Sequence, residues 1–237
     1  DHGSIVAIAD GVSAGGMGRE AAQTTATCLV RDYFGTPETW DTTVALDRVI
    51  AAQNAWLCGI NRRRQPAMGL TTLTALVLRG QSYTLAHVGD SRCYLLRDGR
   101  ATQLTQDHVV QHPDFKHQLL RSVGAEDHLV VDYLQGELQV GDVFILLTDG
   151  VHGDISARRL PEYAAMEDAQ EASQQLVAQA LARGSKDNAS AMVVRVRGLQ
   201  EATLADANRQ AQSLPIPPKL KVGDTLDGFT AVSYTHL

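Results

Sequence analysis

The sequence is poor in cysteine and has no long apolar run, and these absences exclude several classes of protein. Its three cysteines, Cys28, Cys58 and Cys93, are scattered and odd in number, without the spacing of a metal site or a disulfide framework. No apolar run approaches the roughly 20 residues that a membrane-spanning helix needs. The formal net charge of -6 argues against general affinity for nucleic acid. We therefore expect a cytoplasmic segment that binds neither nucleic acid nor a membrane.

The residues that are present have the composition of an ordinary globular protein. The 237 residues are 44% hydrophobic and 20% charged, which is close to the average of soluble domains. This length suits one large domain, or one domain with an appendage. The run Leu214–Pro218 is rich in proline and predicts a stiff linker. We expect a domain that ends near Arg197 and a linker over residues 198–218.

Acidic residues follow or precede three apolar runs. A β-branched run ends at Asp10 and Gly11, and a second apolar run ends in the same way at Asp149. Asp187 stands a few residues before a third run. A buried carboxylate needs a partner, and hard divalent cations take oxygen ligands. The three carboxylates therefore predict a metal site at the edges of three strands.

An aspartate followed by glycine is also a common turn, so each of these pairs has a purely structural alternative. Asp98 and Gly99 illustrate it, because residues 93–96 and 101–104 on either side resemble the two arms of a hairpin. We expect a turn there and no site. The other Asp-Gly pairs indicate a metal site only when they are considered together.

The periodicity of apolar residues predicts an α+β domain with layers of helices and strands. Helices are expected over residues 22–33, 43–62 and 168–182, and strands over residues 5–9, 71–78, 82–88, 92–96, 129–134, 143–147 and 191–194. The strands 71–78, 82–88 and 92–96 are joined by short turns without room for crossover helices, which favours an antiparallel meander.

Six short motifs then carry a resemblance to one family. They are, in chain order, Ala9–Val12 (ADGV), Gly69–Thr72 (GLTT), Ala86–Arg92 (AHVGDSR), Leu104–His108 (LTQDH), Leu147–Gly150 (LTDG) and Gly184–Ser190 (GSKDNAS). By these motifs residues 1–197 resemble the metal-dependent PPM (PP2C-like) serine/threonine protein phosphatases of bacteria. The resemblance implies two packed antiparallel β-sheets flanked by helices, an α-β-β-α sandwich.

The resemblance also implies a reaction and a set of site residues. The reaction is hydrolysis of phosphoserine and phosphothreonine in proteins by a water that two Mn²⁺ or Mg²⁺ ions activate. Asp10 would bridge both ions, Gly11 would offer its carbonyl oxygen, and Asp149 and Asp187 would hold one ion. Catalysis would thus depend on Asp10, Asp149 and Asp187. Asp90 would help to bind a third, weaker ion.

Three departures from the family pattern stand out. Val12 occupies the position where some relatives have a histidine that is proposed as a general acid. After the second Asp-Gly pair the expected acidic residue is displaced, because Gly153 precedes Asp154, which puts the third ion in doubt. The arginine and the acidic ligand that family members carry upstream of the first motif cannot be assigned, because the chain starts at Asp1. We expect an N-terminally truncated domain with little or no activity by itself, and structural roles for His87 and His108.

The last residues, 219–237, have a second resemblance. Residues 220–229 are similar to the lead-in to a serine/threonine protein kinase domain, and fused phosphatase–kinase proteins of bacteria have this order. The alternative is a C-terminal tail that happens to contain glycine and aspartate. The chain has no glycine-rich nucleotide loop there, so this segment by itself is not a kinase.

The sequence therefore predicts a metal-dependent protein phosphatase that acts on phosphoproteins, with a partner or fused kinase. The main alternative is a non-catalytic PPM-like module with a regulatory or binding role, from which metal binding would distinguish it. Another two-metal phosphohydrolase is a second alternative. The absence of histidine-rich ligand clusters in the sequence argues against it.

Overall fold

The structure is a computed structural model that describes residues 2–12, 16–63, 69–110 and 118–202, with isolated residues between 204 and 230. The chain divides into two compact units, 1–201 and 202–237. The described part of the second unit contains a short antiparallel hairpin of β9 (Thr225–Leu226) and β10 (Phe229–Thr230). Among the helices that the structure describes, none combines the length and the apolar character that crossing a bilayer requires.

The first sheet has the strand order β1-β2-β3-β6, and all of its pairs are antiparallel. Its strands are β1 (Ser4–Ile8), β2 (Leu73–Arg79), β3 (Ser82–Val88) and β6 (Asp132–Glu137). The apolar run that leads to Asp10 forms β1, as expected. The strand predicted from residue 129 starts only at Asp132, because pairing begins with His87 opposite Asp132, while Leu129 and Val131 pack against the core under the helices.

The second sheet is also antiparallel, with the order β5-β4-β7-β8. Its strands are β4 (Arg92–Arg97), β5 (Arg100–Gln103), β7 (Val143–Leu147) and β8 (Ala191–Arg195). Asp98 and Gly99 join β4 to β5 with positive φ angles of 51° and 72°, the conformation of a two-residue hairpin turn. The structural interpretation of this Asp-Gly pair is confirmed.

The predicted meander is wrong at its third strand, because β3 and β4 belong to different sheets. β3 pairs with β2 and β6 in the first sheet, and β4 pairs with β5 and β7 in the second. Gly89, with a φ of 108°, begins the crossing between the sheets. A Cβ atom at this position would lie 2.6 Å from the side chain of Thr72, so glycine is needed for both its conformation and its close approach. The crossing places Asp90 between the two sheets.

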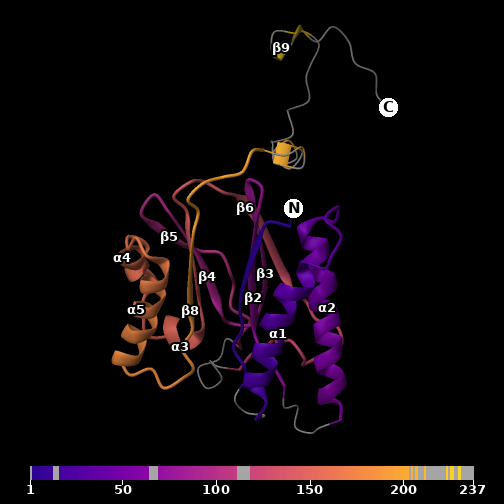
Figure 1. Cartoon of the computed structure of the whole chain (residues 1–237), viewed down its shortest axis with the longest axis vertical. Helices are drawn as coiled ribbons and strands as arrows, with labels where there is room; N and C mark the ends of the chain where they lie inside the picture. The colour runs from indigo at the N-terminus through magenta and orange to yellow at the C-terminus, as the bar shows by residue number, and fades with distance from the viewer. Residues whose placement is uncertain are drawn as a thin grey trace. The chain divides into compact units, whose positions relative to one another are not determined.

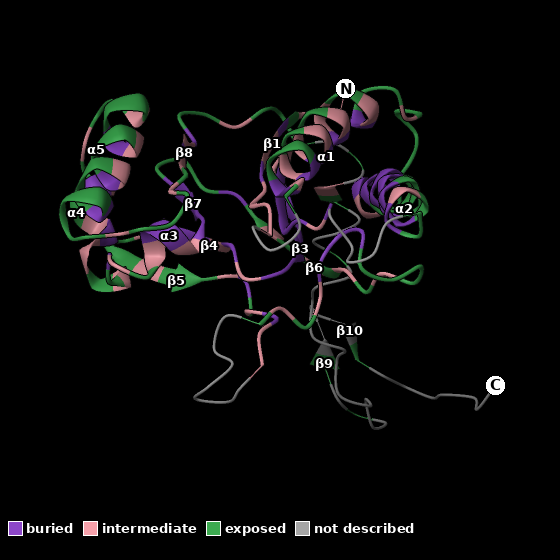
Figure 2. Cartoon of the chain, turned by 90° about the horizontal axis from the view of Figure 1, so that it is seen from below, coloured by how far each residue is buried: buried purple, intermediate pink, exposed green. Residues whose placement is uncertain are grey.

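Helices cover the outer face of each sheet, as Figures 1 and 2 show. α1 (Gly18–Tyr33) and α2 (Thr42–Asn61) lie over the first sheet. The second sheet is covered by α3 (Asp149–His152), η3 (Ala157–Arg159), α4 (Leu160–Ala164) and α5 (Ala169–Ala182). The resulting order of layers is helices, sheet, sheet, helices, which confirms the α-β-β-α sandwich.

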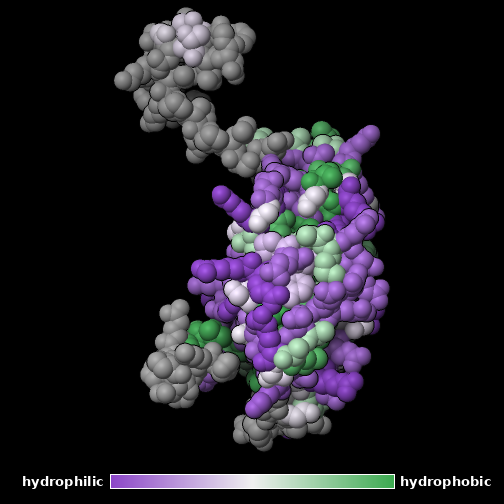
Figure 3. Space-filling model, turned by 90° about the vertical axis from the view of Figure 1, so that its left-hand side faces the viewer, coloured by the Kyte–Doolittle hydropathy of each residue, from purple (hydrophilic) through white to green (hydrophobic). Residues whose placement is uncertain are grey.

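Three apolar clusters hold these layers together, one between each neighbouring pair. The central cluster joins the sheets, and Tyr83 contacts Phe144 there edge to face at 5.1 Å between ring centroids. α5 buries Ala172, Leu176 and Ala180 at helical spacing, and the Asp168 side chain accepts hydrogen bonds from the first turn. The opposite face is polar, and in Figure 3 the surface on this side of the molecule is mainly hydrophilic. The burial pattern thus follows the apolar stripe of the sequence.

Candidate active site

Four of the predicted site carboxylates line one cavity of about 580 Å³ at one end of the two sheets. Asp10 follows β1, Asp90 lies in the crossing from β3 to β4, Asp149 begins α3, and Asp187 precedes β8. These positions are the ends of antiparallel strands that point to the same side of the sandwich. The described residues around the cavity are Asp10, Gly11, Val12, Leu70, Thr72, Asp90, Gln118, Leu119, Leu120, Ser122, Ala125, Glu126, Asp149 and Asp187.

The backbone of Asp10 is held by two threonines, Thr71 and Thr72, just before β2. Its N–H donates to Oγ1 of Thr72 at 2.9 Å. Its carbonyl oxygen accepts from the Thr72 N–H at 2.8 Å and from the Thr71 hydroxyl at 2.9 Å. Oγ1 of Thr72 also lies 2.8 Å from Oγ of Ser91. This network joins Asp10 to the crossing that carries Asp90 and leaves the Asp10 carboxylate to face the cavity.

The segment that carries Asp187 packs against the start of α3. Thr148 exchanges hydrogen bonds with Ser190, and the Ser185 hydroxyl donates to the carbonyl oxygen of Gly150 at 2.7 Å. A Cβ atom on Gly150 would lie only 2.5 Å from the carbonyl oxygen of Asn188. Glycine at this position therefore allows the two segments to approach closely. The close approach brings Asp149 and Asp187 to the same cavity.

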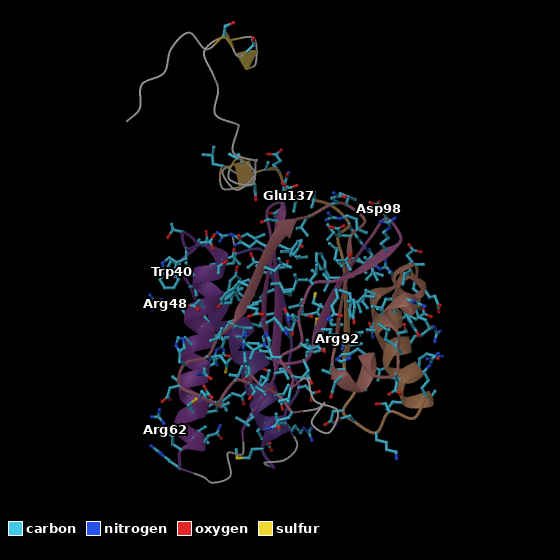
Figure 4. The ribbon with its side chains drawn as sticks, turned by 180° about the vertical axis from the view of Figure 1, so that it is seen from behind. Trp40, Arg48, Arg62, Arg92, Asp98 and Glu137 are labelled. Carbon is cyan, nitrogen blue, oxygen red and sulfur yellow. The ribbon has the colours of Figure 1, made fainter. Side chains whose placement is uncertain are left out.

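Asp90 is held by His152, which lies on α3, a helix that covers the second sheet. Nε2 of His152 donates to the Asp90 carbonyl oxygen at 2.9 Å, and burial lowers the pKa of this histidine, which favours the neutral ring. Arg92 makes a bidentate contact with Asp107 at 2.7 to 3.1 Å. In Figure 4 Arg92 and Asp98 mark opposite ends of β4. The end at Arg92 is the one that faces the site.

The cavity is acidic and has little opposing charge. Burial, and then the nearby carboxylate of Asp149, raise the pKa of Asp10 to about 7. Burial, Asp149 and Asp107 raise the pKa of Asp90 to about 6. Among the described residues that line the cavity, none is lysine, arginine or histidine. The carboxylates therefore repel one another unless a proton or a cation lies between them.

This donor set fits hard divalent cations, although it is not a closed coordination shell. The described His, Cys, Asp and Glu side chains contain no group of three that is arranged to hold one ion. Oxygen donors alone, with an excess of negative charge, suit Mn²⁺ or Mg²⁺. The charges of Asp149, Asp187 and Asp90 all act on Asp10, so these carboxylates lie close enough together to share cations.

The raised pKa of Asp10 predicts how substitution of this residue affects the metal-free fold. A carboxyl group with a raised pKa destabilises the fold when it ionises, so the penalty is absent below its ordinary pKa of 3.8 and complete above about pH 7. We expect Asp10→Asn to stabilise the metal-free protein, and to do so by about 1 kcal/mol more at pH 8 than at pH 6. Urea unfolding of both proteins in EDTA measures this difference, because histidine titrations common to both cancel. Equal effects at both pH values would contradict the raised pKa.

Two histidines within the family-like motifs hold backbone and side-chain groups. Nδ1 of His87 lies 2.9 Å from the Thr74 hydroxyl, and its Nε2 lies 3.1 Å from the Gln106 carbonyl oxygen. His108 accepts from the Gly89 N–H at 3.1 Å and pairs with Asp132. Both rings are buried and do not line the cavity. These contacts agree with the structural roles that we predicted.

Sequence reasoning missed several residues around the site. Thr71 and Thr72 lie in one of the quoted motifs, but no role was assigned to them. No sequence pattern indicated the role of His152, because this role is a hydrogen bond to Asp90, which is far away in the chain. Residues 118–126 form a cavity wall that sequence reasoning did not assign to the site. Asp154, the displaced acidic residue, does not line the cavity.

Comparison with known proteins gives a consistent result. The family model of protein phosphatase 2C matches residues 1–201. The serine/threonine protein phosphatase PstP of Mycobacterium tuberculosis is 28% identical over 81% of this chain and 40% of its own length. The serine/threonine phosphatase stp of Listeria monocytogenes is 27% identical over 82% of this chain and 85% of its own length. The chain thus spans less than half of the length of PstP.

A solved structure supports the same assignment. The catalytic domain of PstP, in a crystal structure with two manganese ions, superposes with a TM-score of 0.70 at 29% identity, over 80% of this chain and 86% of that chain. The layered fold, the strand-end carboxylates and the match over most of the sequence agree. The chain belongs to the protein phosphatase 2C family.

Proposed function

We propose that this chain is the catalytic domain of a metal-dependent protein phosphatase that hydrolyses phosphoserine and phosphothreonine in proteins. The observation that carries the proposal is the convergence of Asp10, Asp90, Asp149 and Asp187 on one acidic cavity in a protein phosphatase 2C fold. The relatives are named serine/threonine phosphatases, and one of them was solved with two manganese ions. We accordingly propose two core ions, Mn²⁺ or Mg²⁺, for this chain.

The proposed ligands are the oxygen donors that line the cavity and that the family resemblance implies. Asp10, Asp149 and Asp187 would hold the two core ions through their carboxylates, and Gly11 would offer its carbonyl oxygen. Asp90 would help to hold a third, weaker ion. When bound, such ions lower the pKa of a water and neutralise negative charge on phosphoryl oxygens.

The described side chains around the cavity can position a substrate, but they offer no free covalent nucleophile. The Thr72 hydroxyl is engaged with the Asp10 N–H and with Ser91, and Ser122 is buried. No cysteine is among the described residues around the cavity. Leu119 and Leu120 add apolar side chains to the cavity wall. These features favour direct attack by water on the phosphorus over a phosphoenzyme intermediate.

A non-catalytic regulatory module is the alternative function. Such a module needs no excess of buried negative charge, and an acidic cavity without a ligand destabilises the fold. The raised pKa values of Asp10 and Asp90 indicate that cost. A regulatory module therefore does not explain why several carboxylates are gathered in one cavity.

The proposal is tested by metal binding and by turnover together. We expect calorimetry to detect binding of Mn²⁺. Turnover, here and in the predictions below, is measured on the chain extended upstream of Asp1 to include the arginine and the acidic ligand that the family resemblance implies, and we expect this protein to hydrolyse a phosphothreonine peptide in Mn²⁺ or Mg²⁺ but not in EDTA. A phosphotyrosine peptide of the same sequence is the control and should be a poor substrate. Full activity in EDTA would overturn the metal mechanism. Mn²⁺ binding without turnover of any phosphopeptide would favour the regulatory module.

We also propose a cytoplasmic location and signalling partners. All three cysteines are free, which suits a reducing compartment. The substrates are phosphoproteins, and a partner or fused serine/threonine kinase would supply them by phosphorylation. The resemblance of residues 220–229 to the lead-in of a kinase domain motivates the fusion.

A further inference from the structure

One wall of the acidic cavity carries an additional negative charge that the proposed metal ligands do not include. Glu126 lines the cavity together with its neighbour Ala125, and it is exposed to solvent. Its carboxylate has no ion-pair partner among the residues that the structure describes. Because Glu126 is not one of the proposed metal ligands, its negative charge is available to interact with a bound substrate.

The backbone at Glu126 is held by buried polar side chains of α2. Nδ2 of Asn54 donates to the Glu126 carbonyl oxygen at 2.8 Å, and the Cys58 thiol donates to the same oxygen at 3.2 Å. Oδ1 of Asn54 accepts from the Gly124 N–H at 2.8 Å. Asn54 is only 1% exposed. These bonds fix the segment on both sides of Ala125, so Glu126 keeps its place on the cavity wall.

Two arginines with ion pairs near this segment, Arg62 and Arg121, are already paired with other carboxylates. Arg62 forms an ion pair with Asp127, the residue after Glu126. Arg121 donates to Asp132 at 2.8 Å and lies beside His108. Neither arginine lines the cavity. Among the described residues that line the cavity, no cation therefore compensates the charge of Glu126.

We propose that Glu126 is a specificity-determining residue that selects phosphopeptides with arginine or lysine beside the phosphorylated residue. The inference rests on the proposed phosphatase function and names the class of its substrate. A cavity of about 580 Å³ admits a phosphorylated side chain, and only the immediate neighbours of that residue can then reach the wall. A guanidinium group pairs with a carboxylate through two hydrogen bonds, so arginine is preferred over lysine.

The test compares two peptides that differ in charge beside the phosphorylated residue. Both carry a non-hydrolysable phosphonate in place of the phosphate, and one has arginine where the other has glutamate. Fluorescence anisotropy in Mn²⁺ gives the ratio of their Kd values without any need for turnover. We expect the arginine peptide to bind about threefold to tenfold more tightly at low ionic strength, with the ratio falling as salt is added.

Substitutions then assign the ratio to one residue. Glu126→Gln should bring the ratio close to one, and Glu126→Lys should reverse it. Glu167→Gln is the control, because Glu167 is also exposed and lies outside the cavity, and its substitution changes the net charge by the same amount. An unchanged ratio in Glu126→Gln, or an equal loss in Glu167→Gln, would overturn the proposal. Absence of turnover with a preserved ratio would contradict the phosphatase function and leave the role of Glu126 intact.

Discussion

Asp149→Asn is expected to lower kcat/KM toward a phosphothreonine peptide by about three orders of magnitude at saturating Mn²⁺. The substitution keeps the shape of the side chain but removes one negative charge and one of the two carboxylate oxygens. Asp149 is the charged residue with the largest effect on the pKa of Asp10. Metal affinity and water activation both depend on that charge, and each tenfold loss requires only about 1.4 kcal/mol. Initial rates over a series of peptide concentrations separate kcat from KM.

The same substitution at Asp154 is the matched control. Asp154 lies just after α3, does not line the cavity, and offers its carbonyl oxygen to Arg183. We expect Asp154→Asn to keep kcat/KM within about twofold of wild type, in line with most surface substitutions. Calorimetry should show weaker Mn²⁺ binding in Asp149→Asn alone. Wild-type activity in a folded Asp149→Asn protein would show that this aspartate is no metal ligand.

Gly150→Ala is expected to destabilise the domain by about 2–4 kcal/mol and to weaken Mn²⁺ binding. The new methyl carbon would lie 2.5 Å from the Asn188 carbonyl oxygen and 2.9 Å from its carbon, and both are backbone atoms that cannot move alone. Relief of the clash separates the start of α3 from the segment that carries Asp187. Urea unfolding measures the stability, and calorimetry measures the metal affinity.

Gly59→Ala provides the opposite case within the same protein. Gly59 lies in α2, is exposed, and has no atom within 4 Å of the position that its Cβ would take. Alanine should therefore stabilise the protein by about 0.5–1 kcal/mol through helix propensity. If Gly150→Ala cost no more than a few tenths of a kcal/mol, the close approach of the two segments would not be needed for the fold.

Much of the local structure was predictable because it depends on short-range patterns. The run before Asp10 became β1, the Asp98–Gly99 pair became a hairpin turn, and Asp168 capped the last long helix. Each of these outcomes follows from periodicity, turn chemistry or capping within a few residues. The strand-end aspartates were recognisable for the same reason, since a charge at the end of an apolar run is visible in the sequence.

The arrangement of the site was decided by the tertiary structure alone. Periodicity reports that β3 and β4 are buried, but it does not report that they pair within different sheets. The crossing at Gly89 puts Asp90 beside the other carboxylates, and α2 holds the wall that carries Glu126 through Asn54. Contacts of this kind join residues that are far apart in the chain. A sequence pattern predicts that a residue is buried, but it does not predict which residue it contacts. The sequence by itself therefore determined the elements, the acidic residues and the family resemblance, whereas the packing of two sheets determined which charges share one cavity.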